Sequence, residues 1–382
     1  MAGKVTFEQL SCNDEHHQIG VAILDNPESL NALTFEMLIQ LNQQLLDWQD
    51  NDQIVCVVIK SNSEKAFCAG GDVRTMHQMM SEKSKQEAQD FCTTYFSLEY
   101  QCDYLTHTYP KPVIAWGEGI IMGGGMGLFM GASHKVVTPK SRLAMPEVSI
   151  GLFPDVGGTW FLNRLESGVG LFLGLTGTMI NANDATELHL ADYLLLEDHQ
   201  TILLTLLRST QWFSANDHYS VINELLEGLT QEAQAHKPPP QISTYLPRIE
   251  FACRGADLAH IWQGILDIQP TDPLSNEGKW LENAQRSMLG GSPITAHIVY
   301  RQIKHYHDLS LADCFKLELG LAVRSGVLGE FQEGVRARLI DKCGDPNWMF
   351  ESIYDVDSKV IDTLFSPLWP TDKHPLAELG KY

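Results

Sequence analysis

Two turns rich in glycine hold the residues best suited to chemistry in this chain. The first lies at residues 69–72 (Ala-Gly-Gly-Asp), after the strand-like run 54–60, and the second at 122–127 (Met-Gly-Gly-Gly-Met-Gly), after the apolar run 112–116. Glycine has no Cβ, so such turns let backbone N–H groups approach a ligand closely. The two turns could therefore direct two N–H groups at one developing oxyanion. Such an arrangement commonly stabilises the transition state of acyl transfer.

Two acids, Glu147 and Asp155, lie in the segment 144–158, which is otherwise apolar and rich in glycine and proline. Apolar surroundings raise the pKa of a carboxyl group, which suits general acid–base or nucleophilic catalysis. Both acids also have structural interpretations. Glu147 could be a helix N-cap or a surface turn residue, and Asp155 could be a turn acid before Gly157 and Gly158.

Other common catalytic and nucleotide-binding motifs are absent from the sequence. It contains no G-x-G-x-x-G fingerprint at the second glycine turn, no G-x-x-x-x-G-K-[ST] loop and no G-x-S-x-G nucleophile elbow. The histidines at 16–17 and at 305 and 307 have no carboxylate or cysteine ligands at metal spacing, which favours surface or packing roles. Cys68, beside the first turn, could be a nucleophile, but no histidine is near it in sequence and a buried packing role is favoured.

The composition of the 382 residues is that of a globular protein, with 44% hydrophobic and 20% charged residues and a net charge of −21. No apolar run approaches the roughly 20 residues of a membrane span. The negative charge argues against nucleic-acid and anionic-membrane partners, although a local cationic patch could still bind an anionic small molecule. Eight cysteines without a C-x-x-C pair indicate reduced, mostly packed thiols. Residues 1–10 carry no targeting pattern, so we expect a cytoplasmic protein.

Hydrophobic patterning predicts an α/β region followed by a helical one. The predicted strands and helices of the first half are listed by residue number: two strands within 4–25, strands at 54–60, 112–116 and 134–137, and helices at 34–49, 85–106 and from the second turn to about 132. Thr34 is the expected N-cap of its helix. From about residue 197 the pattern is helical and strand-poor, which predicts two domains, 1–196 and 197–382. The Lys-Pro-Pro-Pro run at 237–240 is the clearest linker.

Three of these segments together resemble the crotonase (enoyl-CoA hydratase/isomerase) superfamily: 65–72, the glycine triplet at 123–125, and 144–147 (Ala-Met-Pro-Glu). Within it, the run 144–158 and the late segment 331–342 are similar to the 3-hydroxyisobutyryl-CoA hydrolase subfamily. The resemblance spans roughly residues 5–348. It implies a crotonase-like α/β fold, a spiral of ββα units followed by a helical C-terminal region. It also implies that the N–H groups of Gly71 and Gly124 form the oxyanion hole for a CoA thioester carbonyl.

One departure from the hydratases bears on the chemistry. Enoyl-CoA hydratases carry a second catalytic glutamate shortly after the glycine triplet, and the matching position here is Gly127. Glu147 is retained, and Asp155 stands where hydratases usually have glycine. The resemblance therefore implies a hydrolase with Glu147 as its central carboxylate rather than a two-glutamate hydratase.

The implied reaction is hydrolysis of an acyl-CoA thioester. Glu147 either attacks the carbonyl carbon, giving a mixed anhydride, or acts as base for water; the sequence leaves both open. Asp155 would bind the 3-hydroxyl group of the substrate or help to transfer protons. By resemblance Glu99 lines the acyl pocket, although a solvated helix glutamate is an equal interpretation. Lys65 would contact the CoA phosphates or be a plain surface lysine. CoA is part of the substrate, and neither a cofactor nor a metal is implied.

Three functions remain open from the sequence. The first is hydrolysis of 3-hydroxyisobutyryl-CoA in valine breakdown. The second is another crotonase-type reaction, either a hydratase or an isomerase that uses one carboxylate. The third is a non-catalytic acyl-CoA-binding or scaffold protein, against which Glu147 and Asp155 argue. A homo-oligomer is possible, because members of the superfamily often form trimers, although a longer helical C-terminal region could cover that surface.

Overall fold

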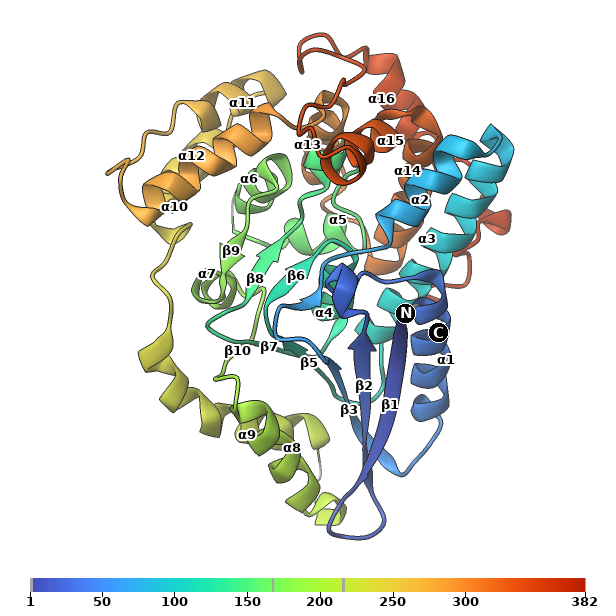
Figure 1. Cartoon of the computed structure of the whole chain (residues 1–382), viewed down its shortest axis with the longest axis vertical. Helices are drawn as coiled ribbons and strands as arrows, with labels where there is room; N and C mark the ends of the chain where they lie inside the picture. The colour runs from blue at the N-terminus through green and yellow to red at the C-terminus, as the bar shows by residue number, and fades with distance from the viewer. Residues whose placement is uncertain (1–2, 167, 215–216, 382) are drawn as a thin grey trace. The chain divides into compact units, whose positions relative to one another are not determined.

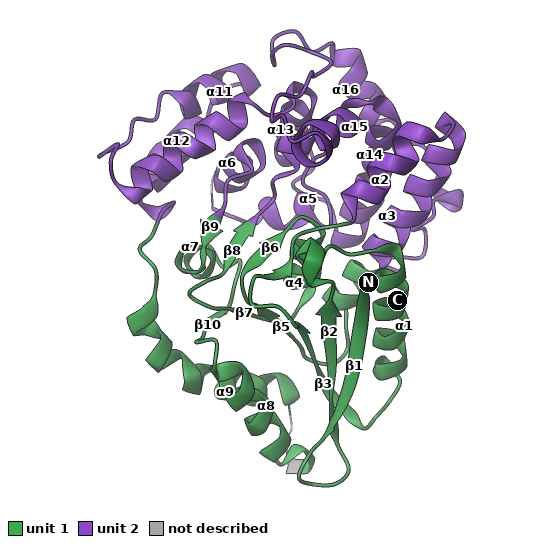
Figure 2. Ribbon diagram, in the orientation of Figure 1, with its two compact units in different colours: residues 1–71, 102–143, 180–240 green, residues 72–101, 144–179, 241–382 purple. Residues whose placement is uncertain are grey.

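The computed structural model describes residues 3–166, 168–214 and 217–381 (Figure 1). The chain divides into two compact units that interleave along the sequence (Figure 2). Unit 1 comprises Met1–Gly71, Cys102–Leu143 and Ile180–Pro240, and unit 2 comprises Asp72–Gln101, Ala144–Met179 and Gln241–Tyr382.

The main sheet of unit 1 has six strands in the order β1-β2-β3-β5-β7-β10. Their bounds are Lys4–Ser11, Gln18–Asp25, Ile54–Ser61, Val113–Gly117, His134–Val137 and Tyr193–Leu194. β1 and β2 form an antiparallel pair, whereas each following pair in the sheet is parallel. The parallel strands are apolar and almost wholly buried, as expected for strands that are covered on both faces.

Helices cover both faces of this sheet. On one face, Trp48 of α1 (Phe35–Gln49) packs so closely on Gly20 that a Cβ there would lie 2.9 Å from its ring. Side chains alternate along a strand, so the neighbours of Gly20, Ile19 and Val21, point to the other face. There they form a buried cluster with α8 (His199–Ser209) and α9 (His218–Ala233).

The units differ from the predicted domains. The last described strand, β10, ends at Leu194, so the strands stop close to the predicted boundary. However, α8 and α9 follow that boundary and still belong to the unit of the sheet, because their apolar faces pack on it. Unit 1 ends at Pro240, the last residue of the predicted linker.

A second, four-stranded sheet has the order β4-β6-β8-β9, with bounds Ala66–Cys68, Ile120–Met122, Arg142–Ala144 and Ile180–Asn181. These strands were not predicted from the sequence, since two or three residues are too short to show an alternating pattern. Two of them, β4 and β6, directly precede the two glycine turns.

The described part of unit 2 is helical. Its helices are α2 (Val73–Glu82), the first part of α3 (Lys85–His107), α5 (Gly158–Leu162), α6 (Val169–Thr176), α10 (Leu246–Cys253), α11 (Leu258–Leu266), α12 (Asn276–Leu289), α13 (Pro293–His305), α14 (Leu311–Leu328), α15 (Glu330–Val335) and α16 (Ser358–Phe365). Serine N-caps start α13 and α14: Ser292 and Ser310 accept N–H groups three residues on. None of the described helices combines the length and apolar character that a bilayer span requires.

Candidate active site

The two glycine turns lie side by side in unit 1 because the strands before them pair in parallel. Ala66 of β4 is in register with Ile120 of β6, so both chains leave the sheet at the same edge. A Cβ on Gly70 would lie 3.5 Å from the carbonyl oxygen of Met122 and 3.8 Å from the nitrogen of Gly124. The short sheet therefore brings together the two turns that the sequence analysis selected.

Glycine is required at several points of these turns. Gly70 has φ of +113° and Gly123 has φ of +51°, conformations that side chains disfavour. A Cβ on Gly125 would lie 2.3 Å from the carbonyl oxygen of Cys68. Gly124 is the first residue of α4 (Gly124–Gly131), where a backbone N–H has no acceptor within the helix. Its N–H could therefore serve a ligand, and the paired oxyanion role of Gly71 and Gly124 stays a prediction.

Gly127, also on α4, has no room for a side chain. A Cβ there would lie 2.6 Å from Oδ2 of Asp103, a fully buried residue of α3. The carboxylate of Asp103 thus occupies the space where a glutamate side chain at position 127 would begin. Gly127 was recognised from the sequence but Asp103 was not, because no local pattern connects the two positions.

The described part of unit 2 contains five buried carboxyl groups, those of Glu99, Glu147, Asp155, Glu318 and Glu330, and the first three were candidates from the sequence. Glu99, Glu147 and Asp155 are 2%, 4% and 4% exposed, and Glu318 of α14 is 0% exposed. The hydroxyl of Tyr100 donates a hydrogen bond to Oδ2 of Asp155 at 2.7 Å. The interpretations of Glu99 as a solvated glutamate and of Glu147 as a surface turn residue are therefore wrong.

Burial dominates the electrostatics of this carboxyl cluster, defined as Glu99, Glu147, Asp155 and Glu318. It raises the pKa of Asp155 to about 7, although the hydrogen bond from Tyr100 acts in the opposite direction. Burial, together with the negative charge of Asp155, raises the pKa of Glu147 and of Glu99 well above the ordinary range. Groups that hold protons near neutral pH are suited to general acid–base work.

Glu147 is the member best placed to act on a ligand. It is the first residue of the short helix η2 (Glu147–Ile150), and its Oε2 is buried without a hydrogen-bond partner among the residues that the structure describes. An oxygen in this state carries a desolvation cost that a substrate or water could relieve.

The backbone of η2 is held by three contacts with the C-terminal helices. Ser292 donates its N–H to the carbonyl of Val148 at 2.9 Å. Gly334 of α15 approaches Ile150 so closely that a Cβ would lie 2.3 Å from its carbonyl oxygen. Gly151, at φ +71°, is packed in the same way against the carbonyl of Glu330.

The segment around Asp155 is held by side chains of α13. Thr295 donates its hydroxyl to the carbonyl of Leu152 at 2.6 Å, and Gln302 donates its Nε2 to the carbonyl of Pro154 at 3.0 Å. Val156, which follows Asp155 directly, has φ of +49°. A β-branched residue in this region costs about 1–3 kcal/mol, so the segment needs such restraints.

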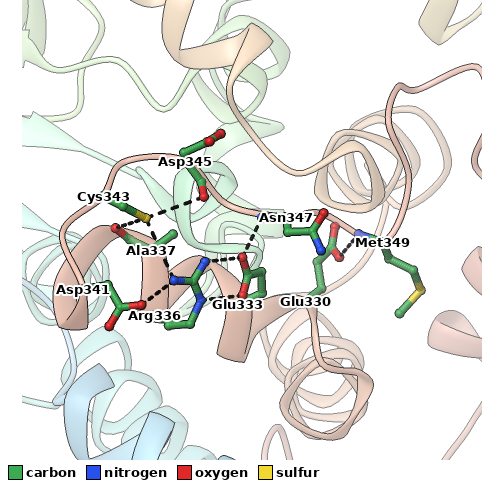
Figure 3. A network of polar contacts seen from close by, with 9 residues as sticks. All are labelled: Glu330, Glu333, Arg336, Ala337, Asp341, Cys343, Asp345, Asn347 and Met349. Atoms are coloured by element: carbon green, nitrogen blue, oxygen red, sulfur yellow. Dashed lines mark hydrogen bonds and ion pairs between the residues drawn. The ribbon is translucent and has the colours of Figure 1, made fainter.

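The late segment 331–342 packs against η2 through Gly334 and carries a network of polar contacts (Figure 3). Arg336 pairs with both oxygens of Glu333, at 2.8 and 2.7 Å, and also with Asp341. Its charge is therefore already neutralised by two acids of the same segment.

Glu330 continues the network of Figure 3 toward the loop at 349. It accepts the N–H of Met349 at 2.9 Å, as Figure 3 shows. Outside the view of that figure, it also accepts the hydroxyl of Ser292 at 2.7 Å. Since Ser292 and α15 both contact η2, the network stabilises the helix that carries Glu147.

The remaining candidates from the sequence are Lys65 and Cys68, both in unit 1. Lys65 is exposed just before β4 in unit 1, and its contact with CoA stays a prediction. Cys68 is fully buried. The other described cysteines are buried as well, except Cys343, which is exposed. Among the described residues, no cluster of three or more histidines, cysteines or acids has a geometry that would hold a metal ion.

Several buried polar residues were missed from the sequence, among them Tyr100, Asp103 and Glu318. Each reads as an ordinary helix residue, and its partner lies far away in the chain. Tyr100 is 55 residues from Asp155, and Glu318 is about 160 residues from the turn that it contacts. The one available signal was the position of Tyr100 directly after Glu99.

Comparison with known proteins places this chain in a family. The sequence model of the family described as enoyl-CoA hydratase/isomerase matches residues 19–365. The chain belongs to this family. Membership implies an acyl-CoA substrate. A solved family structure, an enoyl-CoA hydratase from Rhodobacter sphaeroides 2.4.1, superposes with a TM-score of 0.79 at 25% identity, covering 96% of this chain and 98% of the other. The predicted crotonase-like α/β fold with a helical C-terminal region is thereby confirmed.

Relatives of this chain are named for more than one function. The mitochondrial 3-hydroxyisobutyryl-CoA hydrolase of Danio rerio is 32% identical over 366 residues, which cover 96% of this chain and 90% of the relative. The small ribosomal subunit protein mS47 of Neurospora crassa is 30% identical over 338 residues, which cover 87% of this chain and 66% of the relative. The relatives of this chain thus include one named as a hydrolase and one named as a ribosomal component.

Proposed function

We propose that this family member hydrolyses 3-hydroxyisobutyryl-CoA to 3-hydroxyisobutyrate and CoA, a step of valine breakdown. The observation that carries the proposal is the occupation of the space beside Gly127 by Asp103. A hydratase uses two glutamates, and here the second has neither a side chain nor room for one. The buried acids Glu147 and Asp155 remain, and the relatives named as 3-hydroxyisobutyryl-CoA hydrolases support the substrate.

The proposed chemistry begins at the thioester carbonyl. The N–H groups of Gly71 and Gly124 would stabilise the oxyanion, each contributing about 3 kcal/mol to the transition state. Glu147 would then act in one of two ways. Its carboxylate attacks the carbonyl carbon, the C–S bond breaks, and water hydrolyses the resulting anhydride. Alternatively, Glu147 takes a proton from a water molecule that attacks directly.

Asp155 would serve the acyl group or the leaving group. With a pKa raised to about 7 by burial, it can hold a proton at neutral pH and pass it to the departing sulfur of CoA. A protonated Asp155 could also donate a hydrogen bond to the 3-hydroxyl group, or accept one when ionised. Glu99, buried in the same unit, would line the acyl pocket.

The deciding experiment measures release of CoA thiol from 3-hydroxyisobutyryl-CoA by the wild type and by Glu147→Gln, with hydration of crotonyl-CoA as the comparison. We expect rapid thiol release by the wild type only. Hydration of crotonyl-CoA without thiol release would instead favour a hydratase or isomerase.

A non-catalytic protein is the second candidate, because a relative of similar identity is the ribosomal protein mS47. Binding of acyl-CoA without turnover of either substrate would favour it.

The two roles of Glu147 can be separated by a single turnover in water labelled with ¹⁸O. An anhydride is opened by water at either carbonyl, and attack at the Glu147 carbonyl leaves the label in the protein. Mass spectrometry of the peptide that contains Glu147 then detects it. General-base catalysis leaves this peptide unlabelled and places the label only in 3-hydroxyisobutyrate.

A further inference from the structure

The turn after Asp155 is anchored by a carboxyl group from a distant helix. Glu318 of α14 accepts the N–H of Gly157 on Oε2 and the N–H of Thr159 on Oε1, both at 2.8 Å. Its side chain is fully buried. Both carboxyl oxygens thus accept hydrogen bonds from the backbone of one short turn.

This turn determines where the Asp155 side chain points. Val156 and Gly157 follow Asp155 directly and have φ values of +49° and +88°. The N–H of Gly158 returns to the carbonyl of Asp155 at 2.6 Å. Two successive left-handed residues reverse the chain, so a shift of the turn would rotate Asp155 away from its place.

A second restraint acts on Asp155 from α3. The Tyr100 hydroxyl fixes Oδ2 of the carboxyl group, while Glu318 fixes the backbone two and four residues further on. The other ionisable groups whose charges act within this cluster are Glu99 of α3 and Glu147 of η2. The orientation of Asp155 therefore depends on both side chains, and neither is adjacent to it in sequence.

We propose that Glu318 is a positioning residue for Asp155, which it holds in its productive orientation through the turn at 157–159. The proposal rests on the proposed function, in which Asp155 binds the acyl group or transfers a proton. Glu318 acts only through Asp155, so its contribution should disappear when Asp155 itself is disabled.

Glu330 provides a matched control. It is also a buried glutamate of a C-terminal helix, 2% exposed, and it also accepts two hydrogen bonds, from Ser292 and Met349. Neither of these hydrogen bonds reaches the turn after Asp155. Glu330→Gln therefore has a comparable structural cost without the proposed link to Asp155.

The test is a double-mutant cycle measured by thiol release. In Glu318→Gln an amide group faces one of the two backbone N–H donors, so we expect kcat to fall roughly tenfold or more. KM should change by less than about threefold, because the substrate contacts remain. In the Asp155→Asn background, Glu318→Gln should lower kcat by less than about twofold. Glu330→Gln should lower kcat by the same factor in the wild type and in Asp155→Asn. An equal loss from Glu318→Gln in both backgrounds, or no loss of kcat, would overturn the proposal.

A second readout needs no substrate and separates this proposal from the proposed function. Amide hydrogen exchange of the segment 152–160 should become roughly tenfold faster or more in Glu318→Gln than in the wild type, because the turn opens locally. Glu330→Gln should leave exchange of this segment unchanged. If the wild type releases no CoA, the proposed function fails, and unchanged exchange in Glu318→Gln overturns the anchoring role independently.

Discussion

The glycine turns of unit 1 and the acid-bearing segments of unit 2 are shaped by different means. The turns are set by the backbone: parallel pairing of β4 and β6 brings Gly70 close to Gly124, and glycine tolerates the positive φ values. The acid-bearing segments are set by side chains from far along the chain, such as Thr295, which lies 143 residues from its partner Leu152. The turns depend on the absence of side chains, whereas the acid-bearing segments depend in addition on side chains that reach them from helices distant in sequence.

The two regions should therefore fail differently. Adding a methyl group should damage the turns through steric overlap. Removing a charge or a hydrogen bond from the acid cluster should lower the catalytic rate, with a smaller or even opposite effect on stability.

Glu147→Gln should produce the largest loss of activity, roughly 1000-fold or more in kcat, since a carboxylate is required as nucleophile or base. Stability at pH 7 should change by less than about 1 kcal/mol, because glutamine has the same shape and also leaves a polar atom at the place of Oε2, which has no hydrogen-bond partner. Thiol release and denaturant unfolding would measure both effects. A large loss of stability would contradict the separation between the two regions.

Gly127→Glu tests whether the missing hydratase glutamate can simply be restored. The new side chain would overlap Asp103 and place a second carboxyl group beside it, so we expect at least about 3 kcal/mol of destabilisation and no hydration of crotonyl-CoA. Combining it with Asp103→Ala should recover part of the stability. Thermal unfolding of the two variants provides the comparison, and a fully stable single variant would show that the space beside Gly127 is not limiting.

Local signals explain most of what the sequence could predict. The helix after Thr34 was predicted from its cap, and Thr34 does accept the N–H of Met37 at 3.2 Å. The runs that became β2 and β3 were apolar enough to be recognised. By contrast, β4 and β6 have three residues each, and nothing in three residues indicates a pairing partner.

The candidate site divides along the same line. Glu147 and Asp155 could be selected because the acids stand out within an apolar segment. Glu318, Tyr100 and Asp103 could not, since their roles arise only when helices distant in sequence pack together. For Glu99 the sequence allowed a solvated or a buried position equally, and only its 2% exposure decided between them.

Gly125→Ala should destabilise the protein by about 1–3 kcal/mol and lower activity in parallel, because its Cβ would lie 2.3 Å from the carbonyl oxygen of Cys68. Gly228→Ala in α9 is the matched control. A Cβ there meets nothing within 4 Å, so the substitution should stabilise the helix by about 0.5–1 kcal/mol. Equal effects of the two substitutions on the free energy of unfolding would mean that the turn adapts to a side chain.

The smallest effect concerns the pH dependence of stability. The folded-state pKa of Asp155 is about 7 and that of Glu318 about 8, both raised by burial above their unfolded values near 4. The folded protein therefore binds more protons than the unfolded chain between these values. The stabilising contribution of each group is fully present below pH 4 and is lost as the pH rises toward 7 for Asp155 and 8 for Glu318.

The slope should be at most about 1.4 kcal/mol per pH unit for each group. Asp155→Asn should remove part of the fall in unfolding free energy between pH 5 and 7, measured by denaturant titration at each pH. Gly228→Ala should shift the whole curve without changing its slope, because it alters no ionisable group. A wild-type curve that rises through this range and is unaltered by Asp155→Asn would mean that the acid cluster is hydrated and held by water rather than by the helices of unit 2.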